Sequence, residues 1–231
     1  EKERVREHVR RLTDHIIEHG FQLMDHDGRP TRWARYSPKE LNFDKNWFVE
    51  RGLNSLSILS YLITTAHITG DDKYRDIASI LVNQHGYAQN MIDMKFQRGF
   101  GTGNQSDDEM AFMCYYNLVN YEKDPELRSR YAFSFWLAWQ QEAPELNPFF
   151  NFAFMAACQG LTFEDPWGIY ELEPHSEWLD ESVETLVRFP LDRFNWRHTN
   201  SHRIDITRFH TATRTFDDDD MSNSGYRKNG K

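Results

Sequence analysis

The feature that most constrains the fold of this chain is an alternation between two kinds of helical segment. The segment Glu50–Ile68 carries apolar residues around most of its circumference, a pattern that a helix tolerates only where neighbours shield it on all sides. The next segment, Asp72–His85, has a single apolar stripe at Tyr74, Ile77 and Leu81. The sequence therefore predicts a buried helix followed, through a short turn, by an amphipathic one.

This alternation recurs at an interval of about 50 residues, a period typical of arrays of supersecondary units. Aligning the turn at Asp71–Arg75 with the turn at Asp124–Arg128 brings two units into register. We expect buried helices at Asp107–Asn120 and Pro148–Cys158 and amphipathic helices at Pro125–Gln141 and Glu177–Val187, all preceded by a charged helix at Lys2–Phe21. The stretch Met24–Asn46 reads as a long loop.

The expected fold class is all-α, because no segment shows a convincing pattern for a sheet. The hairpin repeats would form a partial (α/α) toroid, with buried helices as the inner layer and amphipathic helices as the outer layer. An ordinary helical bundle or a solenoid is the alternative. Residues 1–189 form this domain, and residues 190–231 are a polar, irregular segment. The chain begins at Glu1 rather than Met, so we expect further helices or a further domain in the same protein.

Composition argues against several classes of partner. The net charge of −9 disfavours nucleic-acid binding, which needs a basic surface. No apolar stretch approaches membrane-spanning length. Cys114 and Cys158 fall in apolar runs, as expected of buried thiols rather than a disulfide framework. Aromatic residues make up 15% of the chain, and such rings serve either as bulky packing between helices or as surfaces that stack on sugars.

Three carboxylates open the buried helix at Asp107–Asn120. Asp107, Asp108 and Glu109 stand directly before its apolar run, where free amides and the helix dipole favour negative charge. Ser106 followed three residues later by Glu109 matches a capping box, so one interpretation is a helix cap. The other interpretation is an acid/base pair, because two adjacent carboxyl groups titrate apart and leave a protonated acid beside an ionised partner. Both interpretations stay open.

The turn Gly70–Tyr74 between two helices, the hairpin repeat and the acidic Asp107–Met110 motif together resemble the six-hairpin glycosidase-like superfamily. The Asp-Asp-x-x-Met part is similar to unsaturated glucuronyl and rhamnogalacturonyl hydrolases. The likeness covers about Glu50–Val187, too short for a complete ring of six hairpins. The resemblance implies that Asp107 or Asp108 acts as general acid and base on an unsaturated uronic sugar. It also favours a periplasmic or secreted location.

If the buried helices lie side by side, their N-termini open on one common end of the domain, and the active site is expected there. Substrate-binding candidates are two aromatic residues of the preceding loop, Trp33 and Tyr36, together with Asp44, Trp47, Arg51, Arg98 and Trp167. The tryptophans would stack on sugar rings, and Arg51 or Arg98 would pair with a sugar carboxylate. The predicted function is therefore a carbohydrate-active, glycoside hydrolase-like enzyme acting on polysaccharide-derived oligosaccharides, including uronic ones. The alternative is a non-catalytic helical module that binds glycan or protein.

No cofactor and no metal ion is expected. Asp25–Gly28 resembles the start of a calcium loop, but Tyr36 stands at the twelfth position, where such a loop needs Glu. His15 and His19, like His198 and His202, have the four-residue spacing of zinc ligands without the accompanying motif, and Asp217–Asp220 reads as solvated charge. The glycine-rich Gln97–Asn104 follows no strand, so nucleotide binding is disfavoured.

Overall fold

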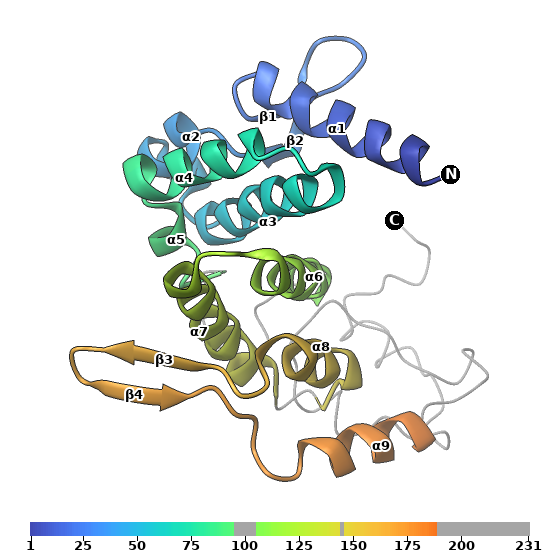
Figure 1. Ribbon diagram of the computed structural model, residues 1–231, viewed down its shortest axis with the longest axis vertical. Helices are drawn as coiled ribbons and strands as arrows, with labels where there is room; N and C mark the ends of the chain where they lie inside the picture. The colour runs from blue at the N-terminus through green and yellow to red at the C-terminus, as the bar shows by residue number, and fades with distance from the viewer. Residues whose placement is uncertain (95–104, 144–145, 189–231) are drawn as a thin grey trace, which may run out of the picture.

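The computed structural model describes residues 1–94, 105–143 and 146–188, and within these ranges the chain is mostly helical (Figure 1). The all-α fold class is confirmed. The longer helices are α1 (Lys2–Glu18), α3 (Arg51–Thr69), α4 (Lys73–His85), α6 (Gln105–Tyr121), α7 (Pro125–Glu142), α8 (Pro148–Cys158) and α9 (Trp178–Arg188). The shorter ones are α2 (Pro38–Phe43), the 3-10 helix η1 (Lys45–Trp47) and α5 (Tyr87–Asn90). None of the helices in these ranges has the length and apolar character that a membrane crossing requires.

Helices α3 and α6 lie side by side and run in the same direction. Near the middle of both helices, the Cys114 thiol lies 3.9 Å from the Ser57 hydroxyl. Near their ends, the rings of His67 and Tyr121 stack with centroids 3.9 Å apart. The contacts advance together along both helices, which makes the pair parallel. Leu59 is fully buried, as expected of a helix with apolar residues around most of its circumference.

Helix α7 runs antiparallel to both α6 and α8. Phe112 near the start of α6 meets Phe135 in α7, with ring centroids 5.0 Å apart. Trp139, further along α7, donates a hydrogen bond from Nε1 to the side chain of Asn151 near the start of α8 at 2.9 Å. The row α3, α6 and α8 is therefore parallel, and Phe112 lies fully buried within it. The end at which these three helices begin is called the N-terminal rim below.

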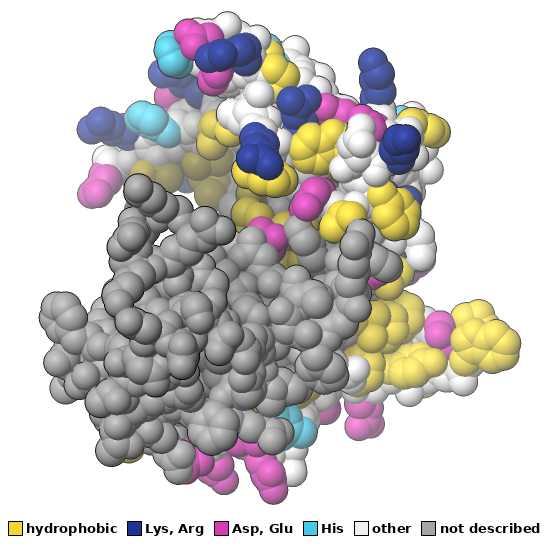
Figure 2. Space-filling model, turned by 180° about the vertical axis from the view of Figure 1, so that it is seen from behind, with side chains coloured by type: hydrophobic (Ala, Val, Ile, Leu, Met, Phe, Trp, Pro, Cys, Tyr) yellow, Lys and Arg dark blue, Asp and Glu magenta, His cyan; other side chains and the backbone are white. Residues whose placement is uncertain are grey.

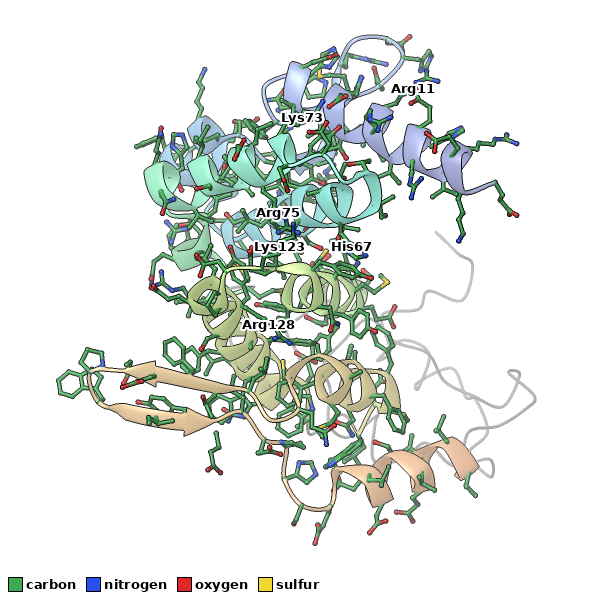
Figure 3. The ribbon with its side chains drawn as sticks, in the orientation of Figure 1. Arg11, His67, Lys73, Arg75, Lys123 and Arg128 are labelled. Atoms are coloured by element: carbon green, nitrogen blue, oxygen red, sulfur yellow. The ribbon has the colours of Figure 1, made fainter. Side chains whose placement is uncertain are left out.

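Two arginines bind the C-terminal end of α6, opposite the N-terminal rim. They occupy equivalent positions in the sequence repeat. Arg75 at the start of α4 donates to the main-chain oxygen of Tyr121 at 2.9 Å, and Arg128 at the start of α7 donates to that of Val119 at 3.0 Å (Figure 3). Both oxygens lie in the last turns of α6, which leave carbonyl groups without helical partners. The two aligned turns therefore have the same structural role. Each supplies an arginine that donates to a main-chain oxygen at the C-terminal end of α6.

Helix boundaries follow local capping. Asp124 accepts from the main-chain N–H groups of Glu126 and Leu127, with Pro125 as the first residue of α7. Asn147 caps α8 in the same way ahead of Pro148. The expected cap at Ser106 is wrong, because α6 already begins at Gln105 and Ser106 therefore lies within its first turn.

Two small hairpins correct the expectation that the chain has no sheet. Strands β1 (Gln22–Met24) and β2 (Pro30–Arg35) pair antiparallel, and so do β3 (Thr162–Asp165) and β4 (Gly168–Glu171). Asp25 closes the first turn by accepting from two main-chain N–H groups through Oδ1. Strands of three to six residues are too short to show a clear alternating pattern in the sequence.

A glycine brings the chain that precedes α6 close to the N-terminal rim. A Cβ added at Gly52, in the first turn of α3, would lie 1.9 Å from the main-chain oxygen of Asp93 and 2.7 Å from that of Met94. Only a residue without a side chain permits this approach. The segment that follows α5 is therefore held against the start of α3.

Candidate functional site

The first turn of α6 presents two neighbouring carboxylates in different surroundings. Asp107 is partly exposed, whereas Asp108 is fully buried, at 0% exposure. Asp108 is buried because it shares a helical stripe with Phe112 and Tyr115, four and seven residues further on, which pack against α7. One of the two carboxylates is thus reached by water and the other is not.

A third carboxylate, Glu142, was missed by sequence reasoning. It is 2% exposed and ends α7. Because α7 is antiparallel to α6, this end of α7 lies at the N-terminal rim, where α6 begins. The signal was present in the sequence, since Glu142 continues the buried stripe of Tyr131, Phe135 and Ala138 at the same spacing. A carboxylate on a buried stripe predicts a buried charge.

Three arginines cover three aromatic rings around the start of α3. The guanidinium of Arg32 lies 4.4 Å from the ring centroid of Trp33, that of Arg35 lies 5.5 Å from Trp47, and that of Arg51 lies 4.9 Å from Phe48. Trp33 is 59% exposed and Trp47 is partly buried against the core. These Arg–aromatic pairs combine positive charge with flat apolar surface.

Buried polar groups fix this surface to α3. Asn54 donates from Nδ2 to the main-chain oxygens of Trp33 and Arg35 at 3.2 and 2.9 Å. Glu40 accepts from Arg35 at 2.7 Å and from Ser37 at 3.0 Å. Glu40 was also missed by sequence reasoning, and it joins β2 to α2. Asp44 is partly exposed and caps η1 by accepting from the main-chain N–H of Asn46 at 2.9 Å.

One of the expected substrate-binding residues, Trp167, is not brought to this surface, and the structure does not test another, Arg98. Arg98 lies outside the described residues. Trp167 is 89% exposed at the turn between β3 and β4. That hairpin packs through Phe163 onto Phe133, with centroids 4.2 Å apart, on the side of α7 turned away from α6. The expectation that Trp167 stacks beside Asp107 therefore finds no support, and Figure 1 shows the hairpin projecting away from the helices.

Tyr36, expected as a stacking surface, is instead buried beneath the rim. Its ring meets Tyr61 edge-on at 5.9 Å, and its main-chain oxygen accepts from the Tyr87 hydroxyl at 2.6 Å. Burial raises the pKa of Tyr36 and of Tyr61. Burial likewise raises the pKa of the nearby Cys114 thiol to about 11. The thiol is therefore protonated at neutral pH, a state unsuited to a nucleophile.

The histidine and aspartate patterns have local explanations where the structure describes them. The rings of His15 and His19 lie 4.2 Å apart, but His15 Nε2 bonds the main-chain N–H of Met24 and His19 Nδ1 bonds the main-chain oxygen of His15. Across residues 1–94, 105–143 and 146–188, no three His, Cys, Asp or Glu side chains gather as a metal site would need. His198, His202 and Asp217–Asp220 lie outside these ranges.

Comparison with known proteins gives no relative for this geometry. No family model matches the chain, and no match was found among curated proteins or solved structures. The resemblance to the six-hairpin glycosidase-like superfamily therefore rests on the residues quoted for it.

Proposed function

We propose that the chain is the helical part of a carbohydrate-active, glycoside hydrolase-like enzyme, built as an arc of an (α/α) toroid. The observation that carries the proposal is the pair Asp107 and Asp108 at the N-terminal rim, one partly exposed and one fully buried. Glycosidic bond cleavage uses two carboxyl groups in different protonation states, and different surroundings are what separate such states.

The Arg–aromatic pairs support an anionic sugar as the substrate. Trp33 offers an exposed ring for stacking, and the guanidinium groups of Arg32 and Arg51 offer paired donors for a carboxylate. The surface lies at the start of α3, and Asp107 lies at the start of the parallel neighbour α6. A uronic oligosaccharide bound over α3 would thus reach the carboxylates of α6.

The roles follow from the surroundings. Asp108, shielded from water, suits the group that holds and delivers a proton. Asp107, reached by water, suits the ionised partner that activates a water molecule. The N-terminal dipole of α6 stabilises negative charge on whichever group is ionised. This division of labour predicts that Asp108 is the more sensitive of the two positions.

The test is a hydrolysis screen against oligosaccharides that end in a uronic or unsaturated uronic sugar, with neutral oligosaccharides alongside. Asp108→Asn is expected to lose turnover by a factor of about 10² to 10⁴ while circular dichroism and sugar binding are retained. Asp76→Asn, an exposed position on α4, makes the same chemical change away from the rim and should keep full turnover. Unchanged turnover in both Asp107→Asn and Asp108→Asn would overturn the assignment.

A non-catalytic binding module is the second candidate, and one observation favours it. Trp167 is exposed on a projecting hairpin that lies off the rim, as a binding surface without a catalytic pocket would be. This candidate predicts that the chain binds members of the oligosaccharide panel without hydrolysing any of them. Trp167→Ala would then weaken binding, whereas Trp33→Ala would leave it unchanged.

A further inference from the structure

The two helices at opposite ends of the described array, α1 and α9, carry opposite charge. Figure 1 places α1 and α9 at the two ends of the long axis. Helix α1 holds five Lys and Arg against four Asp and Glu, with these basic residues in the first eleven positions of the chain, whereas α9 holds three Asp and Glu against one Arg. In the view of Figure 2, the visible Lys and Arg side chains lie in the upper half together with several acidic ones, whereas the lower edge shows acidic side chains without basic ones.

One face of α1 is both basic and apolar. Arg4, Val5, His8, Arg11 and Leu12 are all exposed and follow helical spacing, so they form one stripe, which we call the α1 face. Leu12 is 55% exposed. Neither arginine of the α1 face forms an ion pair with a described residue. This leaves both guanidinium groups available to an anionic partner.

The other arginines of α1 behave differently. Arg6 pairs with Glu3, and Arg10 pairs with Glu7, each at 3.3 Å. The acidic side chains of the helix therefore neutralise the arginines outside the α1 face. The positive charge that remains unpaired on α1 therefore lies on the same side as the exposed apolar residues of the helix. This arrangement is typical of an interaction surface.

Helix α9 has the complementary face with the same spacing. Leu179, Asp180, Val183, Leu186 and Val187 are all exposed and follow helical spacing, and we call them the α9 face. The other side of α9 packs on α8, where Asn151 donates to the Ser182 hydroxyl at 2.8 Å. Leu186 is 55% exposed. Asp180 and the preceding Glu177 form no ion pair with a described residue.

We propose that the α9 face of one copy of this chain binds the α1 face of a second copy. Both faces are about two helical turns long, both carry exposed apolar residues seven apart, and their charges are opposite. The two faces lie at opposite ends of the described helical array, so the interface is heterologous and repeats from copy to copy, which gives a ring or an open chain. A contact between two such short helices is small, so association is weak and is reduced by salt.

The test is sedimentation velocity of the chain at low salt over a wide concentration range, up to about 1 mM. The wild-type chain is expected to associate as concentration rises. One variant reverses the α1 face (Arg4→Glu with Arg11→Glu), and a second reverses the charges beside the α9 face (Glu177→Lys with Asp180→Lys). Each variant alone should stay monomeric, because its two faces then carry like charge.

An equimolar mixture of the two variants should associate again, because each reversed face meets an oppositely charged one. Lys39→Glu with Lys45→Glu lowers the net charge by as much as the variant that reverses the α1 face, but at exposed positions off both faces, and it should associate like the wild type. Leu12→Ser should weaken association without changing the charge. A wild-type chain that is monomeric throughout, or a mixture that stays monomeric while both variants are folded by circular dichroism, overturns the proposal.

Discussion

Asn54 Nδ2 donates a hydrogen bond to the main-chain oxygen of Trp33 at 3.2 Å, which ties an exposed tryptophan to the first turns of a buried helix. The same amide donates to Arg35 at 2.9 Å. Two of the three Arg–aromatic pairs therefore owe their position to one buried side chain on α3. A rigid element holds the surface, as a binding site needs for defined geometry.

Replacing Asn54 should loosen that surface and destabilise the fold. Asn54→Ala leaves two main-chain oxygens without their donor, at an expected cost of about 1–3 kcal/mol in the free energy of unfolding. Urea denaturation measures the loss. Asn120→Ala is the matched control, because its exposed amide bonds only the main-chain oxygen of Tyr116 within α6, and a change below about 0.5 kcal/mol is expected there. Equal losses in the two variants would contradict the role assigned to Asn54.

Gly52→Ala should destabilise the chain even though alanine favours helix. In a helix interior, alanine is more stable than glycine by about 1 kcal/mol. At this position the added Cβ would meet the main-chain oxygen of Asp93 at 1.9 Å, so α3 and the segment after α5 must separate, at an expected cost of about 1–3 kcal/mol. Thermal unfolding followed by circular dichroism decides the sign. A higher midpoint temperature of unfolding in Gly52→Ala would show that the close approach of Gly52 to the Asp93 main-chain oxygen has no energetic consequence.

Helix α3 could be predicted as buried because apolar residues cover most of its faces. The same expectation is only partly met for α6 and α8, which leave Met113, Tyr116, Phe149 and Phe152 exposed. Pro148–Cys158 matches α8 at both ends, since Asn147 and Pro148 provide a local start signal. Helix α6 differs at both ends, and its expected cap at Ser106 falls inside the helix. The cap failed because several polar residues in a row give the start of a helix no unique position.

The candidate site could be predicted only in part, because it depends on contacts between distant segments. Asp108 followed from its place at a helix start, and Glu142 was recoverable from its place on a buried stripe. The position of Trp167 was not recoverable, because it depends on Phe163 meeting Phe133 thirty residues away in sequence. Local patterns identify which face of an element is buried, but they do not identify the element that covers it.

The Cys114 thiol should make the stability of the chain depend on pH in the alkaline range. Burial raises its pKa from an ordinary value near 9.0 to about 11 in the folded chain. The unfolded chain therefore releases the proton first, and stability falls as the pH rises from about 9 to about 11, by at most about 1.4 kcal/mol per pH unit. Urea denaturation at several pH values measures this, with Cys114→Ser as the reference.

The difference in stability between the wild type and Cys114→Ser is therefore expected to shrink across that range. The pKa values of Tyr36, Tyr61 and Tyr115 are raised mainly by burial and further by Cys114, so their contribution differs between the two chains. Tyrosines that do not interact with Cys114 cancel in the difference. The same raised pKa predicts that a disulfide reagent modifies Cys114 slowly at pH 8 in the folded chain and rapidly after unfolding. Cys158→Ser removes the second thiol from this measurement. Fast modification in the folded chain would contradict the assigned environment.

The hydroxyl groups of Tyr115 and Ser134 should act as one unit in stabilising the junction of α5, α6 and α7. They lie 2.8 Å apart, and both reach the main-chain oxygen of Met91, at 3.1 and 2.7 Å. Tyr115→Phe and Ser134→Ala should each cost about 1–2 kcal/mol, because either change leaves the buried group that remains with fewer partners. The double variant should cost less than the sum of the two, with a coupling of about 0.5–1 kcal/mol or more in a double-mutant cycle measured by urea denaturation. Strict additivity would mean that the two hydroxyls bond Met91 independently, and the shared network would then be wrong.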